Sequence, residues 1–179
     1  IAKKVGDKAG EGSSYCNLGN AYHSLGEFKR AIKYHQRHLE IAKEVGDMAG
    51  EGKCYCNLGN AYKSLGQLKT AIKYHQRGLE IAKEVGDKAT EGNSYGNLGN
   101  AYRDLGEFKT AIKYHQRHLE IAKEVGDKAG EGNSYCNLGI AYNSLGELKT
   151  AIKYHQRHLE IVKDVGDKAG EGRSYCNLG

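Results

Sequence analysis

The sequence predicts an all-α fold in which helix pairs stack into a linear array. The block Tyr55–Ala71 recurs in near copy along the chain, and the central residues of its first two Asn-Leu-Gly triplets, Leu18 and Leu58, are 40 residues apart (58 − 18). The later triplets keep this spacing. A fixed period of about 20 to 50 residues is typical of a stacked repeat protein. Pro is absent, and the 25 Gly fall at fixed places in each repeat, where they punctuate helices.

The first helix of the first complete repeat is predicted at 8–24. Gly6 is suited to the left-handed end of a preceding helix, and Asp7 is suited to cap the next one. Apolar or small residues then recur at steps of three and four, which is the spacing of one helical face. That face comprises Tyr15, Leu18, Gly19, Tyr22 and Leu25. A glycine inside a helix costs about 1 kcal/mol relative to alanine, so Gly19 indicates close approach of a neighbouring helix.

The second helix is predicted at 27–45, after a turn at Gly26. Its apolar residues again follow helical spacing. The predicted buried face comprises Phe28, Ala31, Ile32, Leu39, Ala42 and Val45. Ala31 is the small residue against which the first helix is expected to cross. Gly46 and Asp47 repeat the stop and the cap, so two helices form one repeat.

This period predicts one array over 1–179. The array contains four complete repeats, at 7–46, 47–86, 87–126 and 127–166, with the end of a preceding repeat at 1–6 and the start of a truncated one at 167–179. Both ends cut through a repeat, so the chain is expected to be a fragment of a longer array.

Charge, hydropathy and cysteine content limit the cellular location and the class of partner. The net charge of +5, from 27 Lys and Arg against 22 Asp and Glu, does not by itself indicate nucleic acid. No apolar run approaches the about 20 residues of a membrane span, and no signal-peptide pattern is present. The cysteines at 16, 56, 136 and 176 share one repeat position, and neighbouring helices lie about 8 to 10 Å apart, too far for a disulfide. Free thiols favour a cytoplasmic location.

The residues Tyr15, Leu18, Gly19, Tyr22, Gly26, Phe28, Ala31 and Leu39 occur in an order that resembles the tetratricopeptide repeat. The long period and the strings at 96–102 and 114–127 resemble the Leu-Gly-Asn, or Partner of Inscuteable, class of G-protein-signalling modulators. His35 and His38, which depart from the common shorter repeat, are usual in that class.

This resemblance implies a right-handed superhelical solenoid of antiparallel helix pairs, with a concave groove lined by the first helices. It further implies an adaptor in cell polarity, spindle orientation or G-protein signalling, located at the cell cortex or the cytoskeleton.

If the first helices line the groove, the residues opposite the Tyr and Leu face point into it. In the second repeat these are Lys53, Cys56, Asn57, Asn60, Lys63 and Ser64. Asn carries both a donor and an acceptor, which suits the backbone of an extended peptide, although these amides can instead bond the neighbouring helix backbone. Basic residues in the set favour a partly acidic peptide. The candidate peptide-binding residues are Asn17, Asn20, Lys53, Asn57, Asn60, Lys63, Asn93, Asn97, Asn100, Arg103, Asn133, Asn137 and Arg173.

Histidines and cysteines are the other side chains in the sequence that could hold a metal or react. Histidines at i, i+3, such as His35 and His38, have the spacing of metal ligands, but no second pair converges on them and Gly78 breaks the series, so packing is favoured. Cys54 and Cys56 are two residues apart and point to different sides of a helix, which disfavours a zinc or redox site. The sequence contains no arrangement of nucleophile and base and no phosphate loop. No enzyme activity, cofactor or metal is predicted.

The function predicted is therefore a scaffold that binds an extended peptide of a partner protein. One alternative is structural, because nearly identical repeats can stack end to end into assemblies. Another is a basic convex face on the second helices, with Lys29, Lys33 and Arg37 in the first repeat, that binds nucleic acid or an acidic surface. Glu40 beside this stripe and the lack of interleaved aromatics favour a solvated face, so nucleic acid is the less favoured partner.

Overall fold

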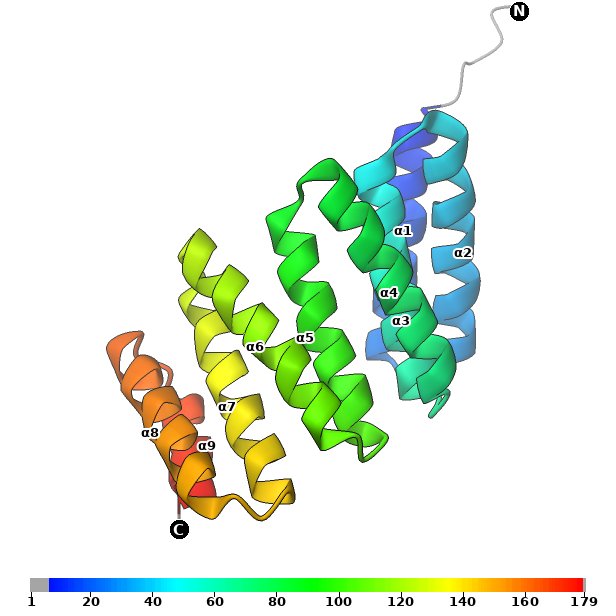
Figure 1. The fold of residues 1–179 in the computed structure, drawn as a ribbon. Helices are drawn as coiled ribbons and strands as arrows, with labels where there is room; N and C mark the ends of the chain where they lie inside the picture. Colours follow the sequence, from blue (N-terminus) through cyan, green and yellow to red (C-terminus); the bar gives the residue numbers. More distant parts are fainter. Residues whose placement is uncertain (1–6, 179) are drawn as a thin grey trace, which may run out of the picture. The chain divides into compact units, whose positions relative to one another are not determined.

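The computed structural model describes residues 7–178, and every regular element in that range is an α-helix (Figure 1). The chain divides into two compact units, Ile1–Thr90 and Glu91–Gly179. The first unit contains α1 (Lys8–Ser24), α2 (Phe28–Val45), α3 (Met48–Ser64) and α4 (Leu68–Val85). Helix α5 (Lys88–Asp104) begins at the boundary, and α6 (Phe108–Val125), α7 (Lys128–Ser144), α8 (Leu148–Asp164) and α9 (Lys168–Leu178) follow in the second unit. The all-α prediction is confirmed.

The predicted caps set the helix bounds. Asp7, at the start of α1, accepts a hydrogen bond from the backbone N–H of Gly10, and Asp47 does the same for Gly50 at the start of α3. Gly46 ends α2 with φ +74°, the left-handed conformation in which glycine avoids a Cβ clash. The predicted stop at Gly6 lies outside the described residues. The second helix begins at Phe28, one residue later than predicted, with Glu27 at the N-cap.

Each helix pair is held by a cluster of three tyrosine rings, in which the closer two are stacked. In the first repeat the Tyr34 ring of α2 lies 5.1 Å from Tyr22 and 6.1 Å from Tyr15, both on α1. The same arrangement recurs in the other complete repeats, with Tyr74, Tyr114 and Tyr154 at the centre. The tyrosine of the second helix was missing from its predicted buried face.

A glycine and a histidine form the closest contact within each pair. A Cβ added to Gly19 would lie 2.4 Å from the His35 ring, so the absence of a side chain at Gly19 makes room for that imidazole. Gly59, Gly99 and Gly139 meet His75, His115 and His155 in the same way. The close approach predicted at Gly19 is therefore present, and its partner is a histidine rather than Ala31.

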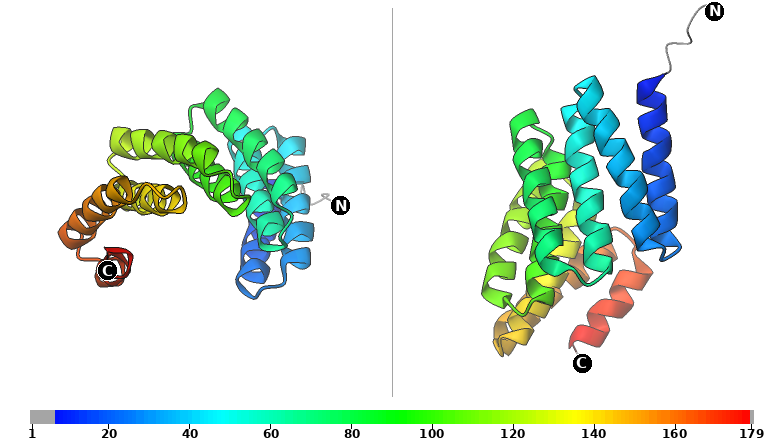
Figure 2. Two further views of the ribbon diagram at one scale, coloured as in Figure 1. Left: turned by 60° about the horizontal axis from the view of Figure 1, so that its bottom comes forward. Right: turned by 90° about the vertical axis from the view of Figure 1, so that its right-hand side faces the viewer.

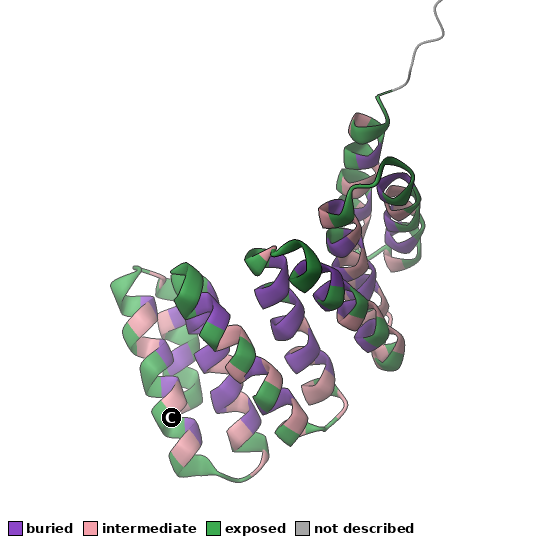
Figure 3. Ribbon diagram, turned by 45° about the horizontal axis from the view of Figure 1, so that its top comes forward, coloured by how far each residue is buried: buried purple, intermediate pink, exposed green. Residues whose placement is uncertain are grey.

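Neighbouring pairs stack through small apolar clusters. In the first unit Ala31 and Ile32 of α2 pack against Leu58 and Ala61 of α3. In the second unit Ile112 of α6 packs against Leu138 and Ala141 of α7. Successive helices in each unit run side by side in alternating directions (Figures 1 and 2), and their buried positions face the neighbouring helices (Figure 3).

Three residues of the predicted buried faces are exposed. Val45 is 47% exposed, because it is the last residue of α2 and the chain turns away at Gly46. Leu25 is 70% exposed at the tip of the turn that follows α1. Leu18 is 42% exposed although its counterpart Leu58 is fully buried, since no described helix precedes α1 to cover it. None of the helices within 7–178 is both long and apolar enough to cross a membrane.

Candidate functional site

The candidate peptide-binding residues lie on the first helices of the repeats, and none of them is fully buried. In the first unit they belong to α1 and α3, and in the second unit to α5, α7 and α9. We call this set the Asn-rich face. Each unit carries its own part of it.

In the first unit, an amide of the Asn-rich face connects two successive first helices. The Nδ2 of Asn57 on α3 donates to the Sγ of Cys16 on α1 at 3.8 Å, and Asn20 Nδ2 donates to the same sulfur at 3.9 Å. Sulfur is a weak acceptor, so these bonds position the amides more than they stabilise the fold. The predicted alternative, a bond to the neighbouring helix backbone, is not the contact formed here.

In the second unit an arginine makes the equivalent connection. Arg103 Nη1 on α5 donates to Asn137 Oδ1 on α7 at 3.1 Å, and Arg103 also pairs with Asp104 at 3.1 Å. Asn177 Nδ2 on α9 donates to Cys136 Sγ on α7 at 3.9 Å. An asparagine two residues after Tyr15 or Tyr55 is the weak sequence signal for this cross-repeat bond, but its partner differs between repeats.

One expected groove position is not on the surface. Cys56 is buried, and a Cβ added to Gly78 of α4 would lie 2.8 Å from the Cys56 sulfur. In the third repeat Gly96 is buried against His118 of α6. Cys56 faces the second helix of its own repeat, because the absence of a side chain at Gly78 lets the sulfur pack there, so Cys56 is removed from the expected groove set. Its counterparts Cys16 and Cys136 are only half-buried.

The basic side chains of the Asn-rich face differ in how far they are already paired with carboxylates of the chain. Lys53 is exposed, and its ammonium contributes to lowering the pKa of Asp87, after the hydrogen bonds from Thr90. Arg173 contacts Asp167 at 3.5 Å, and Arg103 is paired with Asp104. The first unit therefore offers a more open cation to an acidic ligand than the second.

The second histidine of each pair bonds the following repeat. His38 Nδ1 lies 2.9 Å from the Cys54 sulfur, His118 Nδ1 lies 2.9 Å from Ser134 Oγ, and His158 Nδ1 lies 2.8 Å from Ser174 Oγ. The signal in the sequence is a Cys or Ser 16 residues after the histidine (54 − 38), a pairing that was not among the predictions. Cys54 thus faces the preceding repeat while Cys56 faces its own, as their spacing predicted.

The histidine that faces the helix glycine in each repeat is buried, and at least one of its ring nitrogens has no hydrogen-bond partner among the described residues. Neither ring nitrogen of His75 or His115 has a hydrogen-bond partner among the described residues. Burial lowers the pKa of His35 and His75 to about 4 and that of His115 to about 3, because an imidazolium ion there would lose its hydration. These rings are neutral spacers between helices.

Within 7–178 no group of three or more His, Cys, Asp or Glu side chains is placed to hold a metal. Burial raises the pKa of the Cys54 thiol to about 12, so the close His38 does not make it a thiolate. The Cys54–His38 pair is therefore a packing contact and not a nucleophile with its base.

On the second helices the arginines of the basic stripe are already paired. Arg37 contacts Glu40 at 2.5 Å and Arg77 contacts Glu80 at 2.9 Å, with further pairs at Arg117 and Arg157. Lys33 and its counterpart Lys73 are exposed. The arginine of each repeat's stripe is thus neutralised by a glutamate of the same helix, while the lysines remain exposed.

Solved structures similar to this chain are helical-repeat proteins. Aspartyl phosphate phosphatase F from Bacillus subtilis matches with a TM-score of 0.91 at 18% identity, over 96% of this chain and 45% of that protein. A Rap protein complexed with Competence and Sporulation Factor matches with a TM-score of 0.88 at 16% identity, over 95% of this chain and 47% of that one. A signal-transduction ATPase with a tetratricopeptide repeat sensor from Pyrococcus horikoshii matches with a TM-score of 0.86 at 24% identity, over 99% of this chain and 28% of that one.

These likenesses establish the fold alone, and the chain spans less than two thirds of each of these proteins. Among curated protein sequences no match was found. The family model of the tetratricopeptide repeat matches in three overlapping segments, 10–84, 52–124 and 90–164. Arrays of this kind present extended binding surfaces made of many repeats. The chain therefore belongs to the tetratricopeptide repeat family of helical protein-interaction scaffolds.

Proposed function

We propose that the chain is an adaptor whose Asn-rich face binds an extended peptide segment of a partner protein. The observation that carries this proposal is the cross-repeat bonding of the amides: Asn57 is held by Cys16, and Asn137 by Arg103. An amide fixed in this way loses little conformational freedom when it bonds a ligand, which favours binding.

The ligand chemistry follows from the groups that remain available. The Oδ1 of Asn57 makes no hydrogen bond with a described residue, so it is an acceptor for a peptide N–H. The exposed Lys53 favours an acidic residue in the same peptide. We expect an extended, partly acidic segment, with the first unit contributing most of the charge preference.

The Rap protein complexed with Competence and Sporulation Factor supports ligand binding by this fold. Roles in cell polarity, spindle orientation or G-protein signalling, and a location at the cell cortex or cytoskeleton, stay predictions from the resemblance of the sequence. The aspartyl phosphate phosphatase name of another neighbour belongs to a protein of which this chain spans 45%. A scaffold without enzyme activity is the proposal for this chain.

The test compares the chain with a variant in which Asn57, Asn97 and Asn137 are all alanine. A matched control replaces three amides of the second helices, Gln36, Gln76 and Gln116, by alanine. Partners captured by the wild-type chain are identified by mass spectrometry, and peptides from them are titrated against all three proteins at equal helicity. Each lost hydrogen bond is expected to cost about 1 kcal/mol, so the Asn variant binds at least about tenfold more weakly. If the Asn variant and the Gln control bind the peptides equally well, the proposal is wrong.

End-to-end self-association is a second candidate, favoured by one observation. Ile152 of α8 is 44% exposed, whereas its counterparts Ile32 and Ile112 are buried against α3 and α7, the helices that follow them. Light scattering that shows a size increasing with concentration, and unchanged by the Asn variant, would support assembly. Binding of nucleic acid or an acidic surface by the second helices is less favoured, because their arginines are paired with glutamates. Charge reversal of Lys33, Lys73, Lys113 and Lys153 tests it.

A further inference from the structure

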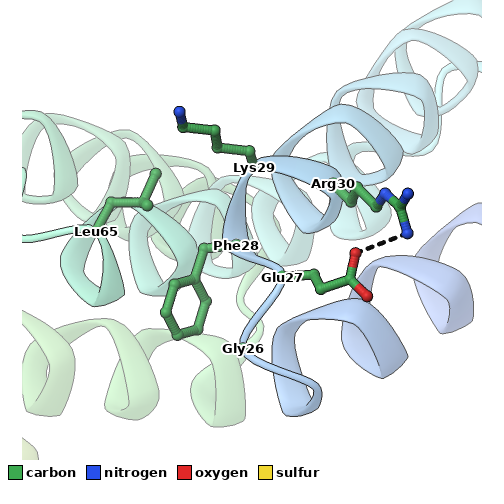
Figure 4. A pocket seen from close by; sticks show the side chains of 6 residues that line it. All are labelled: Gly26, Glu27, Phe28, Lys29, Arg30 and Leu65. Atoms are coloured by element: carbon green, nitrogen blue, oxygen red, sulfur yellow. Dashed lines mark ion pairs between the residues drawn. The ribbon is translucent and has the colours of Figure 1, made fainter.

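A surface pocket lies at the turn that joins α1 to α2. It encloses about 320 Å³ and is lined by Gly26, Glu27, Phe28, Lys29, Arg30 and Leu65. The Phe28 ring and the Leu65 side chain lie on one side of the turn, and the Glu27–Arg30 ion pair lies on the other (Figure 4). The volume is near the lower end of the range for ligand pockets, about 300 to 1,000 Å³. It suits a single inserted side chain better than a cofactor.

The second unit contains the same pocket at equivalent positions. It encloses about 310 Å³ and is lined by Gly106, Glu107, Phe108, Lys109, Thr110 and Leu145. Phe28 and Phe108 are the two Phe residues of the chain, and they are 80 residues apart (108 − 28). Repeats two and four have Leu68 and Leu148 at that position. The aromatic residue thus occurs in the two repeats whose turns line these pockets.

The lining combines an apolar floor with a cation. Phe28 and Leu65 are half-buried, so each presents apolar surface to a ligand. Lys29 is exposed and has no ion pair with any described residue, and Lys33 is exposed one helical turn further on. The Glu27 carboxylate is held by Arg30 at 2.7 Å, which reduces its repulsion of an incoming anion. The charge left at the rim of this pocket is positive.

The backbone at the pocket adds to this preference. The N-cap Glu27 makes no side-chain capping bond, and its carbonyl accepts the N–H groups of Arg30 and Ala31. The N–H groups of Phe28 and Lys29 have no backbone acceptor among the described residues. Free N–H groups at the first turn of a helix favour a carboxylate. They supplement the apolar floor and the lysine, which define the site.

We propose that the pocket at Phe28 and Leu65 is a second binding site, for an acidic peptide segment that inserts one aromatic side chain. The inserted ring packs against Phe28 and Leu65, and a neighbouring carboxylate of the peptide pairs with Lys29. The pocket at Phe108 and Leu145 binds the same chemistry more weakly, because Thr110 replaces Arg30 and the Glu107 carboxylate has no ion pair with a described residue. Neither pocket depends on the Asn-rich face.

The probe is a synthetic peptide of aspartates and glutamates around one central phenylalanine, titrated calorimetrically into the full chain. A second peptide has alanine in place of the phenylalanine. Burial of an aromatic side chain contributes about 1.5 kcal/mol or more, so the alanine peptide is expected to bind at least about tenfold more weakly. The wild-type chain should show two sites of unequal affinity.

Lys29→Glu should weaken the tighter site by about fivefold or more, which corresponds to the loss of one exposed ion pair of about 1 kcal/mol. Thr110→Arg should strengthen the weaker site. The matched control is Lys73→Glu, which changes the net charge equally at an exposed position of α4 outside both pockets. Phe28→Ser should remove the tighter site, and an unchanged unfolding midpoint would show that the fold is retained.

Three outcomes would overturn the proposal. The alanine peptide binding as well as the phenylalanine peptide would exclude insertion of a ring. An equal loss of peptide affinity in Lys73→Glu and Lys29→Glu would show that the peptide is attracted by net charge alone. Loss of binding in the Asn57→Ala, Asn137→Ala variant would place the peptide on the Asn-rich face instead. Retained binding of the phenylalanine peptide in that variant would support the pocket, even if the peptide function proposed for the Asn-rich face proves wrong.

Discussion

Because several histidines are buried as neutral rings, we expect acid to unfold this protein at a pH above that at which carboxylates are protonated. In an unfolded chain a histidine has its ordinary pKa of 6.5, whereas burial lowers the pKa of His75 to about 4. Between these two values the unfolded state binds a proton that the folded state does not. Stability is therefore fully present above pH 6.5 and is lost as the pH falls towards 4.

The size of the effect follows from the shift. A pH of 5 lies 1.5 units below the ordinary histidine pKa (6.5 − 5). Protonation of one histidine then stabilises the unfolded state by about 2 kcal/mol. His35 and His115 have similarly lowered pKa values, to about 4 and about 3. At pH 5 the three rings together lower the free energy of unfolding by about 6 kcal/mol. This is comparable to the total stability of a typical domain, about 5 to 15 kcal/mol.

The assay is urea unfolding followed by far-UV circular dichroism at several pH values between 8 and 4.5. The variant His75→Phe keeps a flat ring against Gly59 but cannot titrate. Its stability at pH 8 can shift in either direction through packing, so the informative quantity is the slope. Between pH 6 and 5 the free energy of unfolding should fall less steeply than in the wild type, by about 1.3 kcal/mol per pH unit. Adding His115→Phe should double this difference. A wild-type stability that is equal at pH 7 and pH 5, or an unchanged slope in the variants, would refute the reasoning.

Two further predictions concern helix contacts and thiols. Gly59→Ala should destabilise the fold by about 1 to 3 kcal/mol, because the new Cβ would lie 2.4 Å from the His75 ring. Gly172→Ala is the matched change at a helical glycine with nothing within 4 Å, and it should stabilise the fold by up to about 1 kcal/mol; thermal unfolding compares the two, and equal effects would contradict the packing argument. In the native protein iodoacetamide should modify the exposed Cys176 and spare the buried Cys54, whose pKa is raised to about 12. Mass spectrometry of the modified chain checks this, and equal labelling would show that the Cys54–His38 contact opens readily.

Local signals predicted the helices because each signal acts within a few residues. Asp47 caps the helix that immediately follows it, and Gly46 takes the left-handed conformation at the end of the helix that precedes it. The three- and four-residue spacing of Leu18, Gly19 and Tyr22 depends only on the helical repeat. These features needed no knowledge of neighbouring helices, and the helix bounds agree with them to within one residue.

The candidate site was predictable in part. That the asparagines share a helix face follows from their spacing, and the structure gives each of them some exposure. Their partners were not predictable, because Asn57 meets a cysteine and Asn137 an arginine of another helix. The burial of Cys56 depends on Gly78, which is 22 residues away (78 − 56) and on a different helix.

The sequence by itself determined the repeat, the helices, their caps and the family resemblance, since all of these follow from period and local propensity. Only the tertiary structure decided that His35 fills the space at Gly19, that His38 reaches the following repeat, and that Phe28 opens onto a pocket with Leu65. Those contacts depend on the distance and crossing angle between packed helices. Helical periodicity specifies which face of a helix is buried, but not which residue of the next helix meets it.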